Sequence, residues 1–266
     1  MNSNSLFSPG IVTVSVDDGH PDDLKAAELL LDTNIKATFY VSANNPERPL
    51  MAQGDIMQIS EHFELGAHTL NHRTLTGLHE KALRDEIVDG KNWLEQVIGT
   101  QVVSFCYPKG KFDRNAMNAV EQAGFLGART CMYNLLGAPS HPQAWGLSTQ
   151  AYSHTVRIQL QHALIERNWR GIRNYLSHYQ RAVDWVEHFQ LGLNYVLQHG
   201  GIAHLYLHSW EISETKQWKR LRNLLREIGR MDGLRTMTNG EVFALWRNRN
   251  DGCSRLNPSL TVCAER

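Results

Sequence analysis

The chain has 266 residues, of which 42% are hydrophobic, and its 27 Lys and Arg residues balance its 27 Asp and Glu residues. This length allows a sizeable core, and we expect one domain over residues 1–266. The balanced charge provides no overall field toward nucleic acid or an anionic membrane, so no nucleic acid partner is expected. The composition leaves the oligomeric state open.

Two features that the sequence lacks bear on where in the cell the protein is expected. No segment approaches the roughly 18 unbroken apolar residues of a membrane span, and the start of the chain lacks the basic and apolar regions of a signal peptide. The four cysteines show no CxxC spacing, which favours free thiols over a zinc knuckle or a redox motif. We therefore expect a cytoplasmic protein without a membrane span.

The first predicted strand ends in two adjacent carboxylates. The segment TVSVDDGH (residues 13–20) alternates valine with Thr and Ser, the period of a strand, and then reaches Asp17 and Asp18. The dipeptide Asp18-Gly19 is also typical of a hairpin turn, because both residues tolerate positive φ angles. Taken alone, this stretch favours the hairpin turn.

Helical and strand patterns then alternate through the first half of the chain. We predict helices over residues 22–34, 55–63, 80–99 and 113–124, and strands over 36–42, 64–69, 101–108 and 125–130. Such alternation implies parallel strands joined by crossovers, in either an open doubly wound sheet or a closed barrel.

The pattern changes after residue 148. A helix-rich stretch covers about residues 151–200, and an apolar strand over 202–208 is the last strand predicted. Further helices are expected around 221–228 and 241–246, with irregular structure from Asp251 onward. In the helix-rich stretch, RNWRGIRNYLSHYQR (residues 167–181) combines arginines with aromatic residues, as a phosphate or glycan site does, although a solvated helical face is the simpler interpretation.

Two histidines lie four residues apart in GAHTLNHR (residues 66–73). If the chain turns helical there, His68 and His72 lie on one face and can share a divalent metal. An aspartate from the first strand would complete the ligand set and leave positions open for water and substrate. With 13 histidines in the chain, the alternative is that this pair is exposed or structural.

A parallel barrel would bring these residues together, because its active site lies at the carboxyl ends of its strands. One carboxylate of the Asp17-Asp18 pair could bind the metal while the other accepts a proton from the metal-bound water. His208 ends the last predicted strand and could protonate a leaving amine; a structural histidine is the alternative.

Five segments, in this order and spacing, resemble the NodB-like polysaccharide deacetylases. The segments TVSVDDG, KATFYV, GAHTLNH, FCYPKG and LYLH cover most of the chain from Ile11 to His208. The resemblance implies an α/β fold, a distorted (β/α) barrel of the NodB type, with the helix-rich insertion before the last barrel strand.

The resemblance also implies roles for individual residues. Asp17 would be the catalytic base, and Asp18, His68 and His72 would hold one divalent metal ion. Zinc is expected first, with iron, cobalt or nickel as alternatives. His208 would be the general acid.

A loop formed by Pro108, Lys109 and Gly110 would place the Lys109 backbone N–H against the tetrahedral oxyanion. Trp210, two residues after the acid, is expected either to stack on a sugar face or to pack against the protein.

The chain departs from the family pattern at two positions. Cys106 stands where many members have an arginine that steadies the base. The segment in which other members carry an Asp-Trp pair that tunes the acid histidine reads GARTCMYN here, and offers Arg129 instead. We hypothesise that Arg129 supplies the charge missing at position 106, with a solvated loop arginine as the alternative.

The predicted function is metal-dependent removal of acetyl from an N-acetylated sugar, in a polysaccharide or in a glycan precursor that the cytoplasm can reach. A small-molecule amidohydrolase or an O-acetyl esterase on the same fold is the first alternative. The second is a metal-bearing binding module without turnover, which the missing arginine at position 106 favours.

Overall fold

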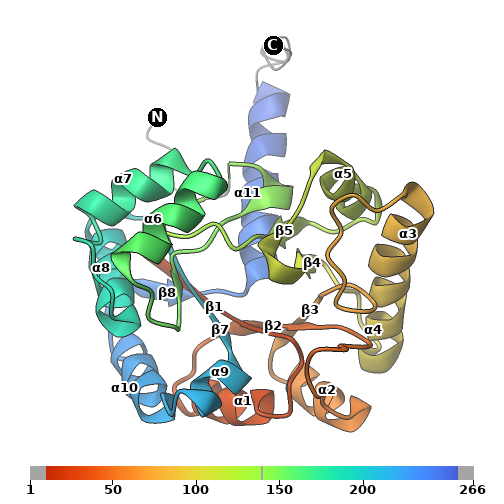
Figure 1. The fold of residues 1–266 in the computed structure, drawn as a ribbon, viewed down its shortest axis with the longest axis horizontal. Coiled ribbons are helices and arrows are strands. Elements are labelled where there is room, and N and C mark those ends of the chain that lie inside the picture. Colours follow the sequence, from red (N-terminus) through yellow and green to blue (C-terminus); the bar gives the residue numbers. More distant parts are fainter. Residues whose placement is uncertain (1–9, 139, 257–266) are drawn as a thin grey trace.

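A curled sheet of parallel strands, surrounded by helices, forms the centre of the molecule (Figure 1). The computed structural model describes residues 10–138 and 140–256. Within these ranges the sheet has eight strands, in the order β5-β4-β3-β2-β1-β7-β6, and β8 pairs with β1 outside this path. The strands are β1 (Gly10–Asp17), β2 (Ala37–Val41), β3 (Glu64–Ala67), β4 (Ser104–Cys106), β5 (Gly127–Arg129), β6 (Thr149–Gln150), β7 (Ile202–His208) and β8 (Leu234–Thr236).

The α-helices before α11 lie between successive strands in the chain and surround the sheet, whereas α11 follows the last strand, β8 (Figure 1). The α-helices are α1 (Asp23–Asp32), α2 (Gln53–Ser60), α3 (Glu80–Arg84), α4 (Gly90–Ile98), α5 (Arg114–Gln122), α6 (Val156–Ile165), α7 (Trp169–Ser177), α8 (Trp185–His199), α9 (Ser209–Glu214), α10 (Trp218–Ile228) and α11 (Asn239–Leu256). Short helical turns are η2 (Asp85–Asp89), η3 (Pro108–Gly110) and η4 (Pro142–Ala144). Helices α6 to α8 form the expected insertion between β6 and β7.

The segment before β6 brings the two ends of the curled sheet together. Trp145 forms a parallel bridge with Arg129 at the end of β5. Its backbone N–H donates to the Ala128 carbonyl (2.9 Å), and its own carbonyl accepts from the Thr130 N–H (2.8 Å). The chain then enters β6, which pairs with β7. The structure therefore has the distorted barrel, one of the two architectures that the alternating pattern allowed.

Strand β1 is buried along its whole length, so both of its faces are covered. Its valines belong to the main apolar core, which also includes residues of the surrounding helices. Thr13 and Ser15 alternate with them, and Ser15 Oγ lies 2.9 Å from His204 Nε2 of β7. Asp17 continues the Thr13 and Ser15 series, because side chains two residues apart point to the same side of a strand.

Three expectations about local structure were wrong. The helix predicted over residues 80–99 is divided into α3, the π-helical turn η2 and α4. The short strands β6 and β8 were missed, because two or three residues are too few to show a strand period. Residues 251–256, expected to be irregular, continue α11. Their polar composition shows no apolar stripe, but extending an existing helix requires no new nucleation.

Two expectations from composition can be compared with the described residues. Cys106 and Cys131 are free thiols, whereas Cys263 lies outside the described ranges. Among the helices in these ranges, none combines the length and apolar character needed to cross a membrane.

Candidate active site

The strand register brings the predicted functional residues to one edge of the sheet. Asp17 of β1 pairs with Tyr40 of β2 on one side and with His208 of β7 on the other. Val41 of β2 pairs with Ala67 of β3, so His68 follows at the same level. Because all of these strands are parallel, their carboxyl ends form a common mouth.

The chain turns sharply after Asp17 but does not form a hairpin. The sheet partners of β1 are parallel to it, and the chain leaves β1 toward α1, so the hairpin interpretation of Asp18-Gly19 was wrong. Asp18 and Gly19 both have positive φ angles, of 82° and 66°. A Cβ on Gly19 would lie 2.8 Å from Val41 Cγ1. Glycine is therefore required for the turn that brings both carboxylates to the mouth.

The spacing of His68 and His72 suggested the face of a helix, but the two histidines lie on a loop. Thr69 and His72 have φ angles of 67° and 52°, in the left-handed region that non-glycine residues rarely adopt. Glu86 of the π-helical turn η2 holds this loop: its carboxylate accepts from the Asn71 backbone N–H (2.9 Å) and side-chain amide (3.0 Å). Sequence reasoning missed Glu86, because its position in a helical pattern carries no signal of this contact. Strained loops maintained by such contacts are typical of functional sites.

Asp18, His68 and His72 form a compact set of three buried ligand atoms. Asp18 Oδ1 lies 3.6 Å from His68 Nε2 and 3.2 Å from His72 Nε2, and all three atoms lie within 4.8 Å of one another. His68 Nδ1 donates to the Cys106 carbonyl (2.8 Å), which leaves Nε2 as the lone-pair nitrogen facing Asp18. One carboxylate and two imidazoles are a donor set that suits zinc, iron or cobalt. These residues therefore fit a divalent metal.

The electrostatics of Asp18 agree with a ligand role. Burial opposes ionisation of its carboxyl group, yet the neighbouring imidazoles of His68, His72 and His208 hold its pKa well below the ordinary value. The carboxylate is thus the stable form, as a metal ligand requires.

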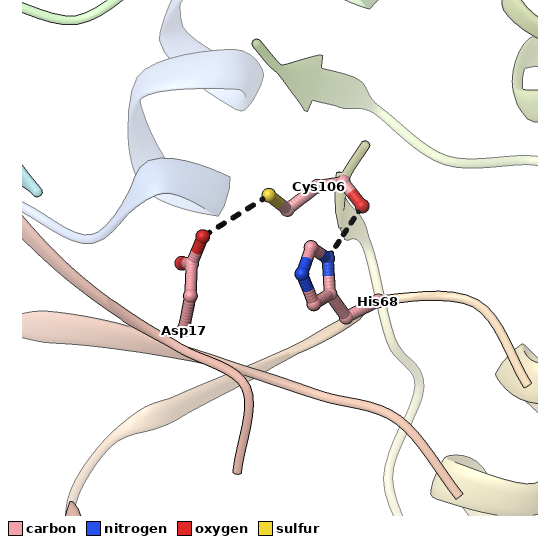
Figure 2. A group of neighbouring side chains, drawn as sticks. All are labelled: Asp17, His68 and Cys106. Carbon is pink, nitrogen blue, oxygen red and sulfur yellow. Dashed lines mark hydrogen bonds between the residues drawn. The ribbon is translucent and has the colours of Figure 1, made fainter. Parts of the chain in front are cut away.

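A second group of potential ligands, Asp17, His68 and Cys106, is drawn in Figure 2. The Cys106 thiol faces Asp17 Oδ2 (3.5 Å), and the Cys106 carbonyl faces the His68 ring. Arg129 Nη2 donates to both Asp17 Oδ2 and Cys106 Sγ, the latter at 2.8 Å. The group of Asp17, His68 and Cys106 does not suit a metal cation, for two reasons. The Arg129 guanidinium already lies against it, and burial raises the pKa of the Cys106 thiol, which disfavours the thiolate that binds metals.

Arg129 is fully buried and forms an ion pair with Asp17. It pairs with Cys106 in the register of β4 and β5, so its guanidinium reaches Asp17 past the small thiol. Its guanidinium carbon lies 5.3 Å from the ring centre of Tyr40 and 4.6 Å from that of Tyr206. Burial disfavours its charge, but the Asp17 carboxylate holds the Arg129 pKa above its ordinary value. Asp17 Oδ1, in contrast, is buried without a hydrogen-bond partner.

His208 is held by a carboxylate that sequence reasoning missed. Its Nδ1 donates to Glu211 Oε2 at 2.8 Å, and Gln150 Nε2 of β6 also donates to that oxygen, at 2.9 Å. Burial lowers the His208 pKa, but the Glu211 hydrogen bond and the charge of Asp18 outweigh it, so the pKa is raised. The available signal was a glutamate three residues after the histidine, at the start of a helix.

Trp210 contacts the ligand set directly. Its indole Nε1 donates to Asp18 Oδ2 at 2.9 Å, and its ring stacks against His208 with 5.0 Å between ring centres. The Arg48 guanidinium also lies over the ring, 3.6 Å from its centre. The indole is thus in contact with protein groups, and sugar stacking would require the Arg48 side chain to move.

The predicted oxyanion loop forms the turn η3. Lys109 and Gly110 have φ angles of 58° and 66°, and a Cβ on Gly110 would lie 2.7 Å from the Cys131 backbone nitrogen. Pro108 is buried, whereas the Lys109 side chain extends outward and pairs with Glu47 at 2.6 Å. Glu47 Oε2 lies 3.8 Å from His72 Nδ1, so this pair borders the ligand set.

Known proteins resemble this chain both in sequence and in fold. The family model described as polysaccharide deacetylase matches residues 7–128. The peptidoglycan-N-acetylglucosamine deacetylase of Bacillus cereus is 26% identical over 43% of the chain and 54% of its own length. The chain spans about half the length of the curated relatives it matches.

Two solved structures share the fold over most of the chain. A Mycobacterium smegmatis protein provisionally assigned to the polysaccharide deacetylases has a TM-score of 0.61, at 15% identity, over 90% of this chain and 91% of its own. A family 4 acetyl xylan esterase from Clostridium thermocellum, in complex with a cobalt ion, has a TM-score of 0.54, at 16% identity, over 88% and 91%. The family-model match over residues 7–128 and the curated relatives confirm the resemblance to the NodB-like polysaccharide deacetylases, and the solved structures show that the fold is shared.

Proposed function

We propose that the chain is a metal-dependent hydrolase that removes acetyl from N-acetylated sugar residues of a glycan or glycan precursor. One observation carries this proposal: the adjacent carboxylates have different partners. Asp18 faces two imidazoles, whereas Asp17 has one oxygen on Arg129 and the other buried without a partner. Two adjacent carboxylates need different partners of this kind if Asp18 is to bind the metal while Asp17 acts as the base.

The proposed chemistry assigns each group one task. A divalent metal held by Asp18, His68 and His72 would supply Lewis-acid polarisation of the acetyl carbonyl. Asp17 Oδ1 accepts the proton of the water that attacks the acetyl carbon, while Arg129 keeps the other oxygen oriented.

The leaving group and the developing oxyanion need further donors. His208, whose protonated form Glu211 favours, donates a proton to the leaving amine. The Lys109 backbone N–H is proposed to donate to the oxyanion, as the family motif implies.

The names of similar proteins support the substrate class and the metal. One curated relative is a peptidoglycan-N-acetylglucosamine deacetylase, and one structure with this fold contains cobalt. The binding-module alternative was favoured by the missing arginine at position 106. That support weakens because the Arg129 guanidinium contacts the proposed base.

The experiment combines metal analysis with acetate release. After chelation, the protein is reloaded with zinc, iron, cobalt or nickel. It is assayed for acetate release on N-acetylated saccharides, sugar nucleotides and O-acetylated xylan, and for ring opening on cyclic amides. We expect one metal per chain and acetate from the N-acetylated saccharides.

The matched variant is His68→Ala with His72→Ala, which should lose stoichiometric metal. If this variant retains one metal per chain, the ligand assignment is wrong. Turnover of acetylated xylan without turnover of any N-acetyl sugar would replace the N-deacetylase with the O-acetyl esterase alternative.

A further inference from the structure

Most of the large apolar side chains on the surface lie in the helix-rich insertion. Nine large hydrophobic residues are exposed in the described part of the chain, and seven of them lie between Tyr152 and Val183. The most exposed are Ile165 at 72% and Trp169 at 67%, at the facing ends of α6 and α7. Apolar residues concentrated in this way on a surface mark an interaction site.

These side chains follow the helical period. On α7, Trp169, Arg173 and Leu176 are spaced four and three residues apart and share one exposed face, while Tyr175 lies buried on another. On α6, Ile158 and Ile165 are seven residues apart and form a second exposed stripe. Helices α6 and α7 therefore each have an apolar face toward solvent as well as a face that is buried in the protein.

The charge of the same segment indicates what would cover it. Residues 152–183 contain five arginines and a single acidic residue, in a chain that is neutral as a whole. Exposed tryptophan and aliphatic side chains among arginines are typical of helices that lie in the interface of an anionic membrane. A nucleic acid would leave the aliphatic side chains without partners, and a second copy of the chain would place like charges together.

The surface adjoins the active site. A cavity of about 330 Å³ is lined by Lys109, Tyr133 and Tyr206 from the barrel and by His162, Ile165 and Glu166 from the insertion. The Tyr206 hydroxyl lies 3.0 Å from His208 Nε2. A membrane against α6 and α7 would therefore border the entrance to the site.

We propose that the exposed faces of α6 and α7 dock on an anionic phospholipid bilayer, without spanning it, and bring the active-site mouth to the level of the headgroups. The docking residues are Trp169, Arg173 and Leu176 of the exposed face of α7, together with Arg170, which is exposed next to Trp169 in the same helix. All four are separate from the proposed catalytic groups. The proposal therefore does not depend on which acetylated substrate the site accepts.

The test is cosedimentation of the full chain with vesicles of phosphatidylcholine alone or with one quarter phosphatidylglycerol. We expect binding to the anionic vesicles that weakens as salt is raised. Changing Arg170→Gln with Arg173→Gln should weaken it roughly 30-fold, because each arginine near such a surface contributes about 1 kcal/mol. Trp169→Glu should weaken it at least about tenfold.

Matched controls lie elsewhere on the surface. Met57→Glu changes a 53% exposed apolar residue of α2, and Arg222→Gln with Arg226→Gln removes two exposed charges of α10. These variants should bind vesicles as the wild type does. Circular dichroism and thermal midpoints check folding, and the arginine pair carries the test if Trp169→Glu unfolds.

Equal binding to both vesicle types, no vesicle binding, or equal losses in the controls would overturn the proposal. So would concentration-dependent dimers, seen by sedimentation velocity, that Trp169→Glu abolishes while vesicles remain unbound. Vesicle binding is read without turnover, so failure of the deacetylase assay leaves this test intact.

Discussion

The two ends of the barrel both contain carboxylates that are buried or half-buried, but their partners differ. At the carboxyl end, Asp17 and Asp18 face a guanidinium and imidazoles, and one Asp17 oxygen has no partner. At the amino end, Glu64 begins β3, and both of its oxygens accept hydrogen bonds from neutral donors. These donors are the Thr38 and Ser104 hydroxyls and the Gly240 backbone N–H.

The difference shows that burial of a carboxylate does not by itself indicate a functional site. Glu64 accepts from an N–H in the first turn of α11 at 2.9 Å, and it thereby attaches that helix to the barrel. Its hydrogen-bonding capacity is used within the fold. Asp17 has one buried oxygen without a hydrogen-bond partner, and this oxygen lies on the carboxylate next to the proposed metal ligand Asp18.

The largest effect is expected at the proton-transfer groups. Asp17→Asn and His208→Ala should each lower turnover by roughly 10² to 10⁴, because each removes a proton acceptor or donor, while metal content stays near the wild-type value. Steady-state kinetics and metal analysis measure both quantities, and Asp32→Asn, an exposed change, is the control. Loss of metal in Asp17→Asn would instead make Asp17 a ligand.

A smaller loss, about tenfold to hundredfold in turnover, is expected for Arg129→Ala. Arg129→Lys should recover only part of it, because an ammonium cannot hold a carboxylate in the planar fork of a guanidinium. The exchange Cys106→Arg with Arg129→Cys places the arginine on the neighbouring strand and should also recover part of the loss. Wild-type turnover in Arg129→Ala would exclude a role in steadying Asp17.

Glu211→Gln should lower turnover about tenfold with amide substrates, because the hydrogen bond that orients and charges His208 is weakened. With an aryl acetate, whose leaving group needs little protonation, the loss should be much smaller. The control Glu28→Gln changes an exposed residue of α1. An equal loss with both substrates would contradict the proposed link to the general acid.

At the other end of the barrel, Glu64→Gln should lower the free energy of unfolding by about 1–3 kcal/mol, because an amide NH₂ would face donors in place of an acceptor. Turnover per folded molecule should not change. Urea unfolding measures the first quantity, with the exposed Glu61→Gln as the control. If Glu64→Gln lowered turnover without changing stability, Glu64 would have a catalytic role and the two ends of the barrel would not differ in function.

The pH dependence of stability offers the smallest of these effects. Burial raises the pKa of Glu64 above its ordinary value of 4.5. Between pH 4.5 and the raised pKa, Glu64 is protonated in the folded state and ionised in the unfolded state. The stability that protonated Glu64 contributes is therefore present below pH 4.5 and is lost as pH rises through the raised pKa. Thermal midpoints of wild type and Glu64→Gln across pH 4 to 8 should therefore converge as pH increases. A gap that widens with pH would mean that Glu64 is favoured as a carboxylate.

Several parts of the site could be predicted from residue order alone. The valine period located Asp17 and Asp18 at a strand end, and the order of the five segments located His68, His72 and His208 at others. The loop conformations could not be read in this way, because the left-handed Thr69 and His72 are maintained by Glu86, which lies in a different element.

What the sequence by itself determined is which residues end the parallel strands, since side-chain period and chain connectivity are local properties. Only the tertiary structure decided which of those residues touch. The register of β4 and β5 sets Cys106 beside Arg129 and so brings a guanidinium to Asp17, while the turn from β7 into α9 sets Glu211 against His208. Register and helix entry depend on how distant segments pack together, and no local pattern in the chain encodes that packing.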